Sequence, residues 1–186
     1  MTGFEIYNKT IGIVGFGAIG REVARRALAF GMRVLVHTAH PPLDYLKAKG
    51  YQACNTLTEM ASQADILTLH IPLTAETRQI INGTIINDIK PGLVIINTSR
   101  GALVDASAIV AGLANGLIGG YLTDVLDTDP MAEDEPLRHF PNVLITPHIG
   151  SRTFESVERQ GIMAVENLVN MIAGNKAAYQ SRLVLP

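Results

Sequence analysis

A glycine-rich turn between an apolar run and a helical pattern constrains this chain more than any other feature. The turn reads Gly15-Phe16-Gly17-Ala18-Ile19-Gly20 and matches G-x-G-x-x-G. It follows residues 10–15, which are typical of a buried strand, and it opens the helical pattern of residues 18–31. In that setting Gly15 permits the tight turn, Gly17 lets a pyrophosphate approach the backbone, and Gly20 lets the helix pack close to the strand. The whole turn is therefore predicted to bind a dinucleotide, with an S-adenosylmethionine-binding loop as the main alternative.

The rest of the chain alternates short β-branched runs with longer helical stretches, which indicates a parallel sheet with crossover helices. Further strands are expected at residues 33–38, 66–69, 93–98, 118–124 and 143–146. Helices are expected at 18–31, at 43–50, after the capping box of residues 56–59, from Asp105 to Asn115, and at 153–174. Apolar residues make up 47% of the 186 residues and charged residues 17%, which fits a folded domain and excludes a disordered chain. The predicted fold class is α/β, with a doubly wound parallel sheet of the Rossmann type.

Charge and cysteine content exclude several other classes of protein. The formal net charge of −2 provides no basic field, so neither a nucleic acid nor an anionic membrane is an expected partner. Cys54 is the only cysteine, which excludes an internal disulfide framework and a cysteine-based zinc site, and no metal is expected. The N-terminal residues lack the features of a signal peptide, and no apolar run approaches the ~18 residues that would span a bilayer. We therefore expect a cytoplasmic protein.

The end of the second strand bears on which dinucleotide binds. An acidic residue is expected about 20 residues beyond the glycine turn, where it accepts hydrogen bonds from the ribose hydroxyls. Thr38 stands at that position. A threonine removes the negative charge that would repel a 2′-phosphate, and His40 is the nearest residue that could bind this phosphate. NAD and NADP both remain open, with a slight preference for NADP.

Four further segments follow the glycine turn in a set order. They are His70-Ile71-Pro72-Leu73-Thr74 with Thr77, Asn97-Thr98-Ser99-Arg100-Gly101, Asp124-Val125 leading to Asp129-Pro130, and Thr146-Pro147-His148-Ile149-Gly150. Together with the turn they resemble the D-isomer-specific 2-hydroxyacid dehydrogenases, a family that includes glyoxylate/hydroxypyruvate reductases and 3-phosphoglycerate dehydrogenases. The resemblance runs from about Tyr7 to Gly174. It implies hydride transfer between a nicotinamide cofactor and a small 2-oxo or 2-hydroxy acid.

The resemblance also implies three catalytic residues. Arg100 would hold the substrate carboxylate and polarise the 2-oxo group. His148 would donate a proton to the carbonyl oxygen as the hydride arrives, and would accept a proton in the reverse reaction. A carboxylate should orient this histidine, and Asp129 stands where the family usually places a glutamate before proline. Aspartate is one methylene shorter, so either the backbone closes the gap or the contact with His148 is weaker. The alternative is that Asp129 belongs to a plain acidic loop.

For the cofactor, the resemblance implies contacts along the carboxyl ends of several strands. The adenine and ribose side is assigned to Ile71, Pro72 and Thr77. The nicotinamide side is assigned to Asn97, Thr98, Asp124, His148 and Gly150, and Ser99 and Arg100 are also included among the cofactor-binding residues. Because the family commonly dimerises through this domain, the resemblance implies a homodimer.

Members of the family carry a second domain, built from the segment before the glycine turn and from the C-terminal tail. Only residues 1–9 precede the first expected strand here. We therefore expect a residual linker at 1–9, a dinucleotide-binding domain at 10–174, a tail at 175–186, and a substrate domain that is largely absent. Two functions remain open. One is an NAD(P)-dependent 2-hydroxyacid dehydrogenase, present mainly as its cofactor domain, and the other is a catalytically silent NAD(P)-binding or sensing module that acts through a protein partner.

Overall fold

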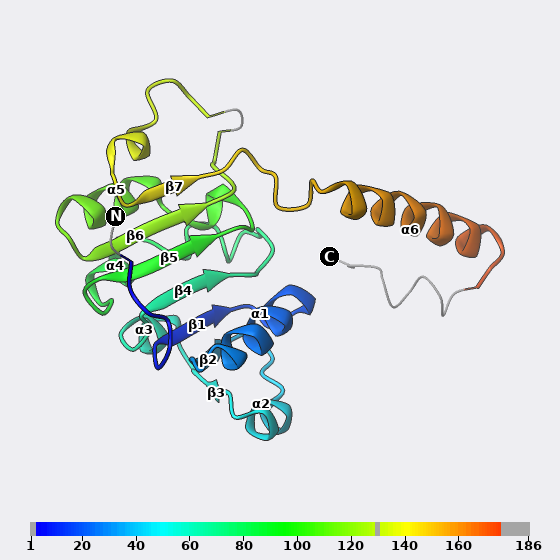
Figure 1. The fold of residues 1–186 in the computed structure, drawn as a ribbon, viewed down its shortest axis with the longest axis horizontal. Helices are drawn as coiled ribbons and strands as arrows, with labels where there is room; N and C mark the ends of the chain where they lie inside the picture. Colours follow the sequence, from blue (N-terminus) through cyan, green and yellow to red (C-terminus); the bar gives the residue numbers. More distant parts are fainter. Residues whose placement is uncertain (1–2, 129–130, 176–186) are drawn as a thin grey trace. The chain divides into compact units, whose positions relative to one another are not determined.

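Seven parallel strands form the sheet on which the fold is built (Figure 1). The computed structural model describes residues 3–128 and 131–175. The strands are β1 (Thr10–Val14), β2 (Arg33–His37), β3 (Gln52–Ala53), β4 (Ile66–Leu69), β5 (Leu93–Asn97), β6 (Ile118–Thr123) and β7 (Val143–Ile145). They lie in the order β3-β2-β1-β4-β5-β6-β7, and every neighbouring pair is parallel. This order confirms the predicted doubly wound α/β fold. It reverses direction between β1 and β4, which is where such sheets bind their ligands.

Helices cover both faces of the sheet. α1 (Ala18–Ala29) and α2 (Leu43–Lys49) contribute to one core cluster, which also contains Ile13 of β1. α3 (Leu57–Ala61), α4 (Gly83–Asn87) and α5 (Ala106–Ala114) contribute to a second cluster, which contains the next residue of β1, Val14. Because successive side chains of a strand point to opposite faces, the two clusters lie on opposite sides of the sheet. Two short 3-10 turns, η1 (Gly101–Leu103) and η2 (Pro136–His139), lie in the connections.

Side-chain caps and glycines define several helix ends. Thr56 Oγ1 accepts a hydrogen bond from Glu59 N at 3.1 Å, and Asp105 Oδ1 accepts one from Ser107 N at 3.0 Å, so both predicted N-caps are confirmed. Gly31 and Gly50 follow α1 and α2 with φ of 73° and 72°, the left-handed conformation that glycine adopts most easily. One detail differs from a full capping box. The carboxylate of Glu59 accepts from Asn55 N, at 2.9 Å, and not from Thr56 N.

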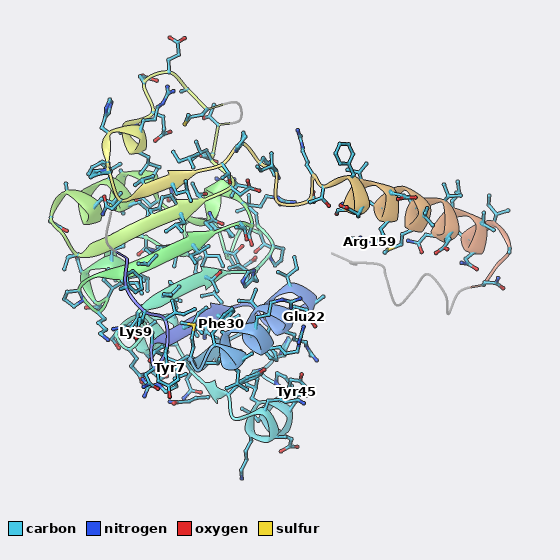
Figure 2. All side chains as sticks on the ribbon, viewed as in Figure 1. Tyr7, Lys9, Glu22, Phe30, Tyr45 and Arg159 are labelled. Atoms are coloured by element: carbon cyan, nitrogen blue, oxygen red, sulfur yellow. The ribbon has the colours of Figure 1, made fainter. Side chains whose placement is uncertain are left out.

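The buried face of α1 consists of small residues. These are Gly20, Ala24 and Ala27. The helix is predicted from Ile19, Val23, Ala27 and Phe30, which recur at helical spacing. Ile19 is 68% exposed and Phe30 is 63% exposed. Figure 2 labels Phe30, which lies just beyond the helix. The helix lies close to β1, because a Cβ added at Gly20 would meet the carbonyl oxygen of Gly15. Val23 packs against the core, so the apolar spacing predicts the helix and identifies part of its buried face.

The chain divides into two compact units, Met1–Pro147 and His148–Pro186. The first contains the sheet. The second contains α6 (Phe154–Ile172), whose N-cap Thr153 accepts a hydrogen bond from Ser156 N at 3.1 Å, and which agrees with the helix predicted at 153–174. Residues 176–186 of the expected tail lie outside the described residues, as do Asp129 and Pro130. Within the described ranges, no helix combines the length and apolar character needed to cross a membrane.

Candidate functional site

The glycine turn joins β1 to α1 and has the geometry that a phosphate-binding turn requires. Gly15 has a φ of 93°, and a Cβ at this position would meet the carbonyl oxygen of His70. Gly17 has φ −76° and ψ −163°, and a Cβ added there would meet no atom within 4 Å. The space beside Gly17 is therefore open to a pyrophosphate. Gly17 is also the N-cap of α1, and in the described part of the chain no side chain caps this helix, which leaves its N-terminal amides for an anion.

The segment after β4 lies against this turn. Ile71 Cγ2 would be 2.6 Å from a Cβ built on Gly15, so Ile71 borders the turn directly. The hydroxyl of Thr77 donates to the Pro72 carbonyl oxygen at 2.8 Å and accepts from Thr74 N at 2.7 Å. These bonds hold the loop folded at the point where the strand order reverses. The three residues predicted for the adenine and ribose side, Ile71, Pro72 and Thr77, thus share one ordered segment beside the glycine turn.

Two histidines at the ends of strands bond to neighbouring parts of the first unit. His37 ends β2, and its Nδ1 lies 3.2 Å from the Cys54 carbonyl oxygen. His70 directly follows β4, and its Nε2 lies 3.1 Å from Thr68 Oγ1. Burial lowers the pKa of the His70 imidazole, so this ring is neutral at pH 7. His37 therefore has a structural partner, which leaves His40 as the exposed histidine beyond β2.

No acidic residue stands at the end of β2. Thr38, which follows the strand, is half-buried, and Ala39 and His40 are exposed. The first carboxylate beyond the strand belongs to Asp44, in the first turn of α2. Dinucleotide-binding domains often carry an acidic residue here that accepts hydrogen bonds from the ribose hydroxyls, and in this chain the position is uncharged.

Arg21 is a candidate residue that the sequence analysis missed. Its guanidinium carbon lies 5.3 Å from the ring centroid of Phe16 and 5.2 Å from that of Tyr45. Its Nε donates to the Phe16 carbonyl oxygen at 3.2 Å. The Phe16 ring in turn packs edge-on against Tyr51, with centroids 6.1 Å apart. A positive charge is thus held at the glycine turn by two aromatic rings. The sequence feature that could have pointed to Arg21 is a cationic side chain directly after the third glycine of the motif.

The turn from Asn97 to Gly101 presents Arg100 beyond the carboxyl end of β5. Asn97 is fully buried, and its Nδ2 donates to the Arg100 carbonyl oxygen at 2.9 Å while its Oδ1 accepts from Ser99 N at 3.1 Å. Ser99 Oγ donates to the Leu69 carbonyl oxygen at 2.7 Å, which ties the turn to β4. Arg100 itself is exposed. The buried amide of Asn97 therefore builds the backbone from which Arg100 projects.

The chain beyond β6 packs against this turn at Gly101. A Cβ added to Gly101 would meet the backbone of Leu126 and Asp127, so only glycine permits this approach. The contact brings the segment that leads to Asp129 alongside the Arg100 turn. Asp129 itself lies outside the described residues.

A cavity of about 200 Å³ opens at the carboxyl ends of β5, β6 and β7. Its apolar lining comes from Ile96, Leu122 and Leu144, and its polar lining from Thr98, Thr123, Asp124 and Thr146. The carboxylate of Asp124 accepts a hydrogen bond from Thr146 Oγ1 at 2.6 Å, and Thr123 Oγ1 donates to the Asn97 carbonyl oxygen at 3.0 Å. Apolar walls with a few convergent polar groups suit a flat ring that carries an amide. Two residues predicted for the nicotinamide side, Thr98 and Asp124, meet in this cavity.

Two further residues predicted for the nicotinamide side, His148 and Gly150, belong to the second unit, whereas Arg100 and Asp124 belong to the first. His148 has a φ of 52°, which is uncommon for a residue with a side chain. Asn8 and Gln79 share this backbone conformation, so it does not distinguish a catalytic residue, and the role of His148 stays a prediction.

The strand order, the open glycine turn and the cavity at the strand ends define a dinucleotide-binding α/β domain of the Rossmann type. Residues 1–150 match the family described as D-isomer specific 2-hydroxyacid dehydrogenase, NAD binding domain. The chain belongs to this family, and the resemblance inferred from the sequence is confirmed.

Named relatives support the same assignment. The chain is 38% identical over 174 residues to a glyoxylate reductase of Aeropyrum pernix, covering 94% of this chain and 52% of the relative. It is 38% identical over 170 residues to a hydroxypyruvate reductase of Thermotoga maritima, covering 90% and 54%. The crystal structure of a glyoxylate reductase from Paecilomyes thermophila is similar with a TM-score of 0.85 and 36% identity, covering 92% of this chain and 52% of that chain. The chain thus spans about half the length of these relatives.

Proposed function

We propose that this chain is the cofactor-binding part of an NAD(P)-dependent oxidoreductase that interconverts 2-oxoacids and D-2-hydroxyacids. The observation that supports this most directly is the Arg100 turn. A buried amide and a hydrogen bond to β4 hold Arg100 at the strand ends, beside the segment that leads from Asp124 towards Asp129. Residues 10–174 would form the dinucleotide-binding domain, preceded by a linker at 1–9 and followed by a tail at 175–186. The functional unit would be a homodimer, which light scattering after gel filtration would detect.

The described residues fit a dinucleotide, because a Cβ at Gly17 would meet nothing and the helix behind it has no side-chain cap. The glycine turn, with Phe16, Ala18 and Ile19, would bind the pyrophosphate, and Ile71, Pro72 and Thr77 would enclose the adenosine. We propose NADP(H) as the preferred form, because Thr38 leaves the end of β2 uncharged and His40 is the nearest residue that could bind a 2′-phosphate. Arg21 adds a positive charge at the glycine turn. Thr98 and Asp124 would bind the nicotinamide carboxamide, with Asn97 and Ser99 supporting the turn and Gly150 completing the site.

The reduced cofactor supplies a hydride when it is bound. Arg100 would bind the substrate carboxylate through its planar guanidinium and draw electron density from the 2-oxo group. His148 Nδ1 or Nε2 would donate a proton to the carbonyl oxygen, and would accept a proton from the hydroxyl in the reverse direction. Asp129 would hold the proton on the other ring nitrogen and keep the imidazole oriented.

A fluorescence titration tests this proposal. The chain contains no tryptophan, so the emission of NADPH or NADH can be followed with little interference. We expect NADPH to bind more tightly than NADH. When the substrate domain of a relative is added, we expect glyoxylate or hydroxypyruvate to oxidise the bound cofactor. Arg100→Gln should abolish turnover and leave cofactor affinity unchanged to within about threefold, because Arg100 is assigned mainly to the substrate carboxylate. Binding without turnover of any 2-oxoacid would favour the silent sensing module, and absence of cofactor binding would refute both functions.

A further inference from the structure

A larger cavity lies at the opposite edge of the sheet from the glycine turn. Its volume is about 610 Å³, which is within the range of sites for small molecules. Lys9 directly precedes β1, Arg33 begins β2, and Asp65 directly precedes β4, so the cavity spans the amino ends of three neighbouring strands. Figure 2 labels Lys9 at the beginning of β1. The five residues of β1 separate this cavity from the glycine turn by about 17 Å, at ~3.3 Å per residue.

The cavity contains one carboxylate, and its charge is already compensated. Asp65 Oδ1 accepts a hydrogen bond from Lys90 Nζ at 2.6 Å, and Asp65 Oδ2 accepts one from Thr10 N at 2.8 Å. Burial acts against ionisation, but these two hydrogen bonds and the charges of Lys90 and Lys9 hold the pKa of Asp65 below its usual value. Asp65 is therefore ionised at neutral pH and positions Lys90 in the cavity wall.

Lys9 and Arg33 add further positive charge to the lining of the cavity. Over residues 3–128 and 131–175, neither side chain forms an ion pair. Lys9, Arg33 and Lys90 thus share a lining with a single carboxylate, which leaves this lining with a net charge of +2. Arg33 N donates to the Lys9 carbonyl oxygen at 2.9 Å, so the two cations project from hydrogen-bonded neighbours on adjacent strands. A concave, polar surface of this kind attracts a multiply charged anion.

The rim of the cavity is preformed. Asn8 and Gly31 both have positive φ, of 60° and 73°, and Asn8 N donates to the Gly31 carbonyl oxygen at 3.1 Å. Both residue types tolerate this conformation, so the rim is held without large strain. The cations are therefore presented from the ends of paired strands, and binding requires little ordering of the backbone.

We propose that this cavity binds a small polyanion that carries a phosphate or pyrophosphate group. The guanidinium of Arg33 can bind two oxygens of such a group at once, and the ammonium group of Lys9 can neutralise part of its remaining charge. The site is separate from the glycine turn and does not depend on the proposed function. Its ligand would bind at the amino edge of the sheet, while a dinucleotide would bind at the carboxyl edge.

Calorimetric titration of the full chain with inorganic pyrophosphate tests the site. We expect Arg33→Gln and Lys9→Ala each to weaken pyrophosphate binding about tenfold or more, because each removes a charge-assisted contact. Added salt should weaken binding to the unsubstituted chain. Lys47→Ala is the matched control, since Lys47 is an exposed lysine of α2 outside the cavity lining, and it should leave the affinity unchanged. Thermal unfolding of each variant establishes that it is folded.

The glycine turn needs its own control, because it is also assigned to bind phosphate groups. Gly17→Val would fill the open space beside that turn, and binding of pyrophosphate at the amino edge should persist in this variant. Equal affinity in Arg33→Gln, Lys9→Ala and the unsubstituted chain would overturn the proposal, as would a loss of binding confined to Gly17→Val. Absence of binding at millimolar pyrophosphate would overturn it too. Failure of NADPH to bind would count against the proposed function alone.

Discussion

Two glycines of the same turn should respond to alanine in opposite ways. At Gly17 a Cβ would meet no atom within 4 Å, and the φ of −76° is one that alanine adopts readily. At Gly20 a Cβ would meet the carbonyl oxygen of Gly15 and would lie 3.3 Å from Ile13 Cγ2. Gly17→Ala should therefore impair ligand binding and leave the fold intact, whereas Gly20→Ala should destabilise the fold.

The magnitudes follow from these contacts. In Gly17→Ala, alanine is a poorer N-cap than glycine, which lowers stability, but it also reduces the conformational entropy of the unfolded chain, which raises stability. The free energy of unfolding should therefore change by less than about 1 kcal/mol. The added methyl group lies where the pyrophosphate approaches, and NADPH affinity should fall at least tenfold, or about 1.4 kcal/mol. Overpacking at Gly20 costs about 1–3 kcal/mol, and the upper end applies because the obstacle is backbone that cannot rotate away. A loss of ~3 kcal/mol lowers Tm by about 6–12 °C in a chain of this size.

Thermal unfolding followed by circular dichroism and NADPH fluorescence titration measure the two effects. Gly83→Ala is a suitable control, because Gly83 lies in α4 and a Cβ there would also meet no atom within 4 Å. This variant should keep both the unfolding temperature and the NADPH affinity of the unsubstituted chain. If Gly17→Ala binds NADPH as tightly as the unsubstituted chain, the pyrophosphate does not approach the backbone at Gly17. If Gly20→Ala unfolds at the same temperature as the unsubstituted chain, the close packing at Gly20 does not contribute to stability.

Three further predictions concern single side chains. Thr38→Asp should lower the affinity for NADPH relative to NADH at least about tenfold, because a carboxylate at the end of β2 accepts hydrogen bonds from ribose hydroxyls and repels a 2′-phosphate. Paired fluorescence titrations with NADPH and NADH measure this, and an unchanged ratio of the two affinities would contradict it. The pKa of His70 lies below its ordinary value of 6.5, so the unfolded chain binds more protons as the pH falls below 6.5, and stability should decline there. His70→Gln should flatten that decline in Tm between pH 7.5 and 5.5, and a parallel decline in both proteins would refute the assignment. Asn97→Ala should cost about 1–3 kcal/mol in urea unfolding, because it removes the side-chain partner of the Arg100 carbonyl oxygen and of Ser99 N. Asn97→Asp should cost more, because its carboxylate would face the Arg100 carbonyl oxygen. The reverse order would count against this role for Asn97.

Most of the fold could be predicted because its elements carry local signals. β4 begins and ends at the predicted residues, and Asp105 caps α5 as its position implies. β3 and α4 were not predicted, since two and five residues are too short for a periodic pattern. β3 forms because Leu35 and Val36 of β2 pair with Gln52 and Ala53, and such pairing depends on residues distant in the sequence.

In the candidate site too, residues whose role depends on local backbone geometry could be predicted, and residues whose position depends on distant parts of the chain could not. The roles of Gly15, Gly17 and Gly20 could be predicted from their spacing, because each depends on backbone geometry within one turn. The position of Arg21 could not, because it depends on α2 bringing Tyr45 to the turn from elsewhere in the chain. The three catalytic assignments came only from the family resemblance, and the relation between Arg100, Asp129 and His148 stays a prediction.

The strand order has a consequence for the way this protein is synthesised. β1 lies inside the sheet and is the first of the seven described strands in the chain. Each later one pairs with a strand that precedes it: β2 and β4 with β1, β3 with β2, β5 with β4, β6 with β5, and β7 with β6. None of these described strands therefore emerges from the ribosome before its inner neighbour has been translated. The sheet can grow outward at the pace of translation, at about 5–20 residues per second.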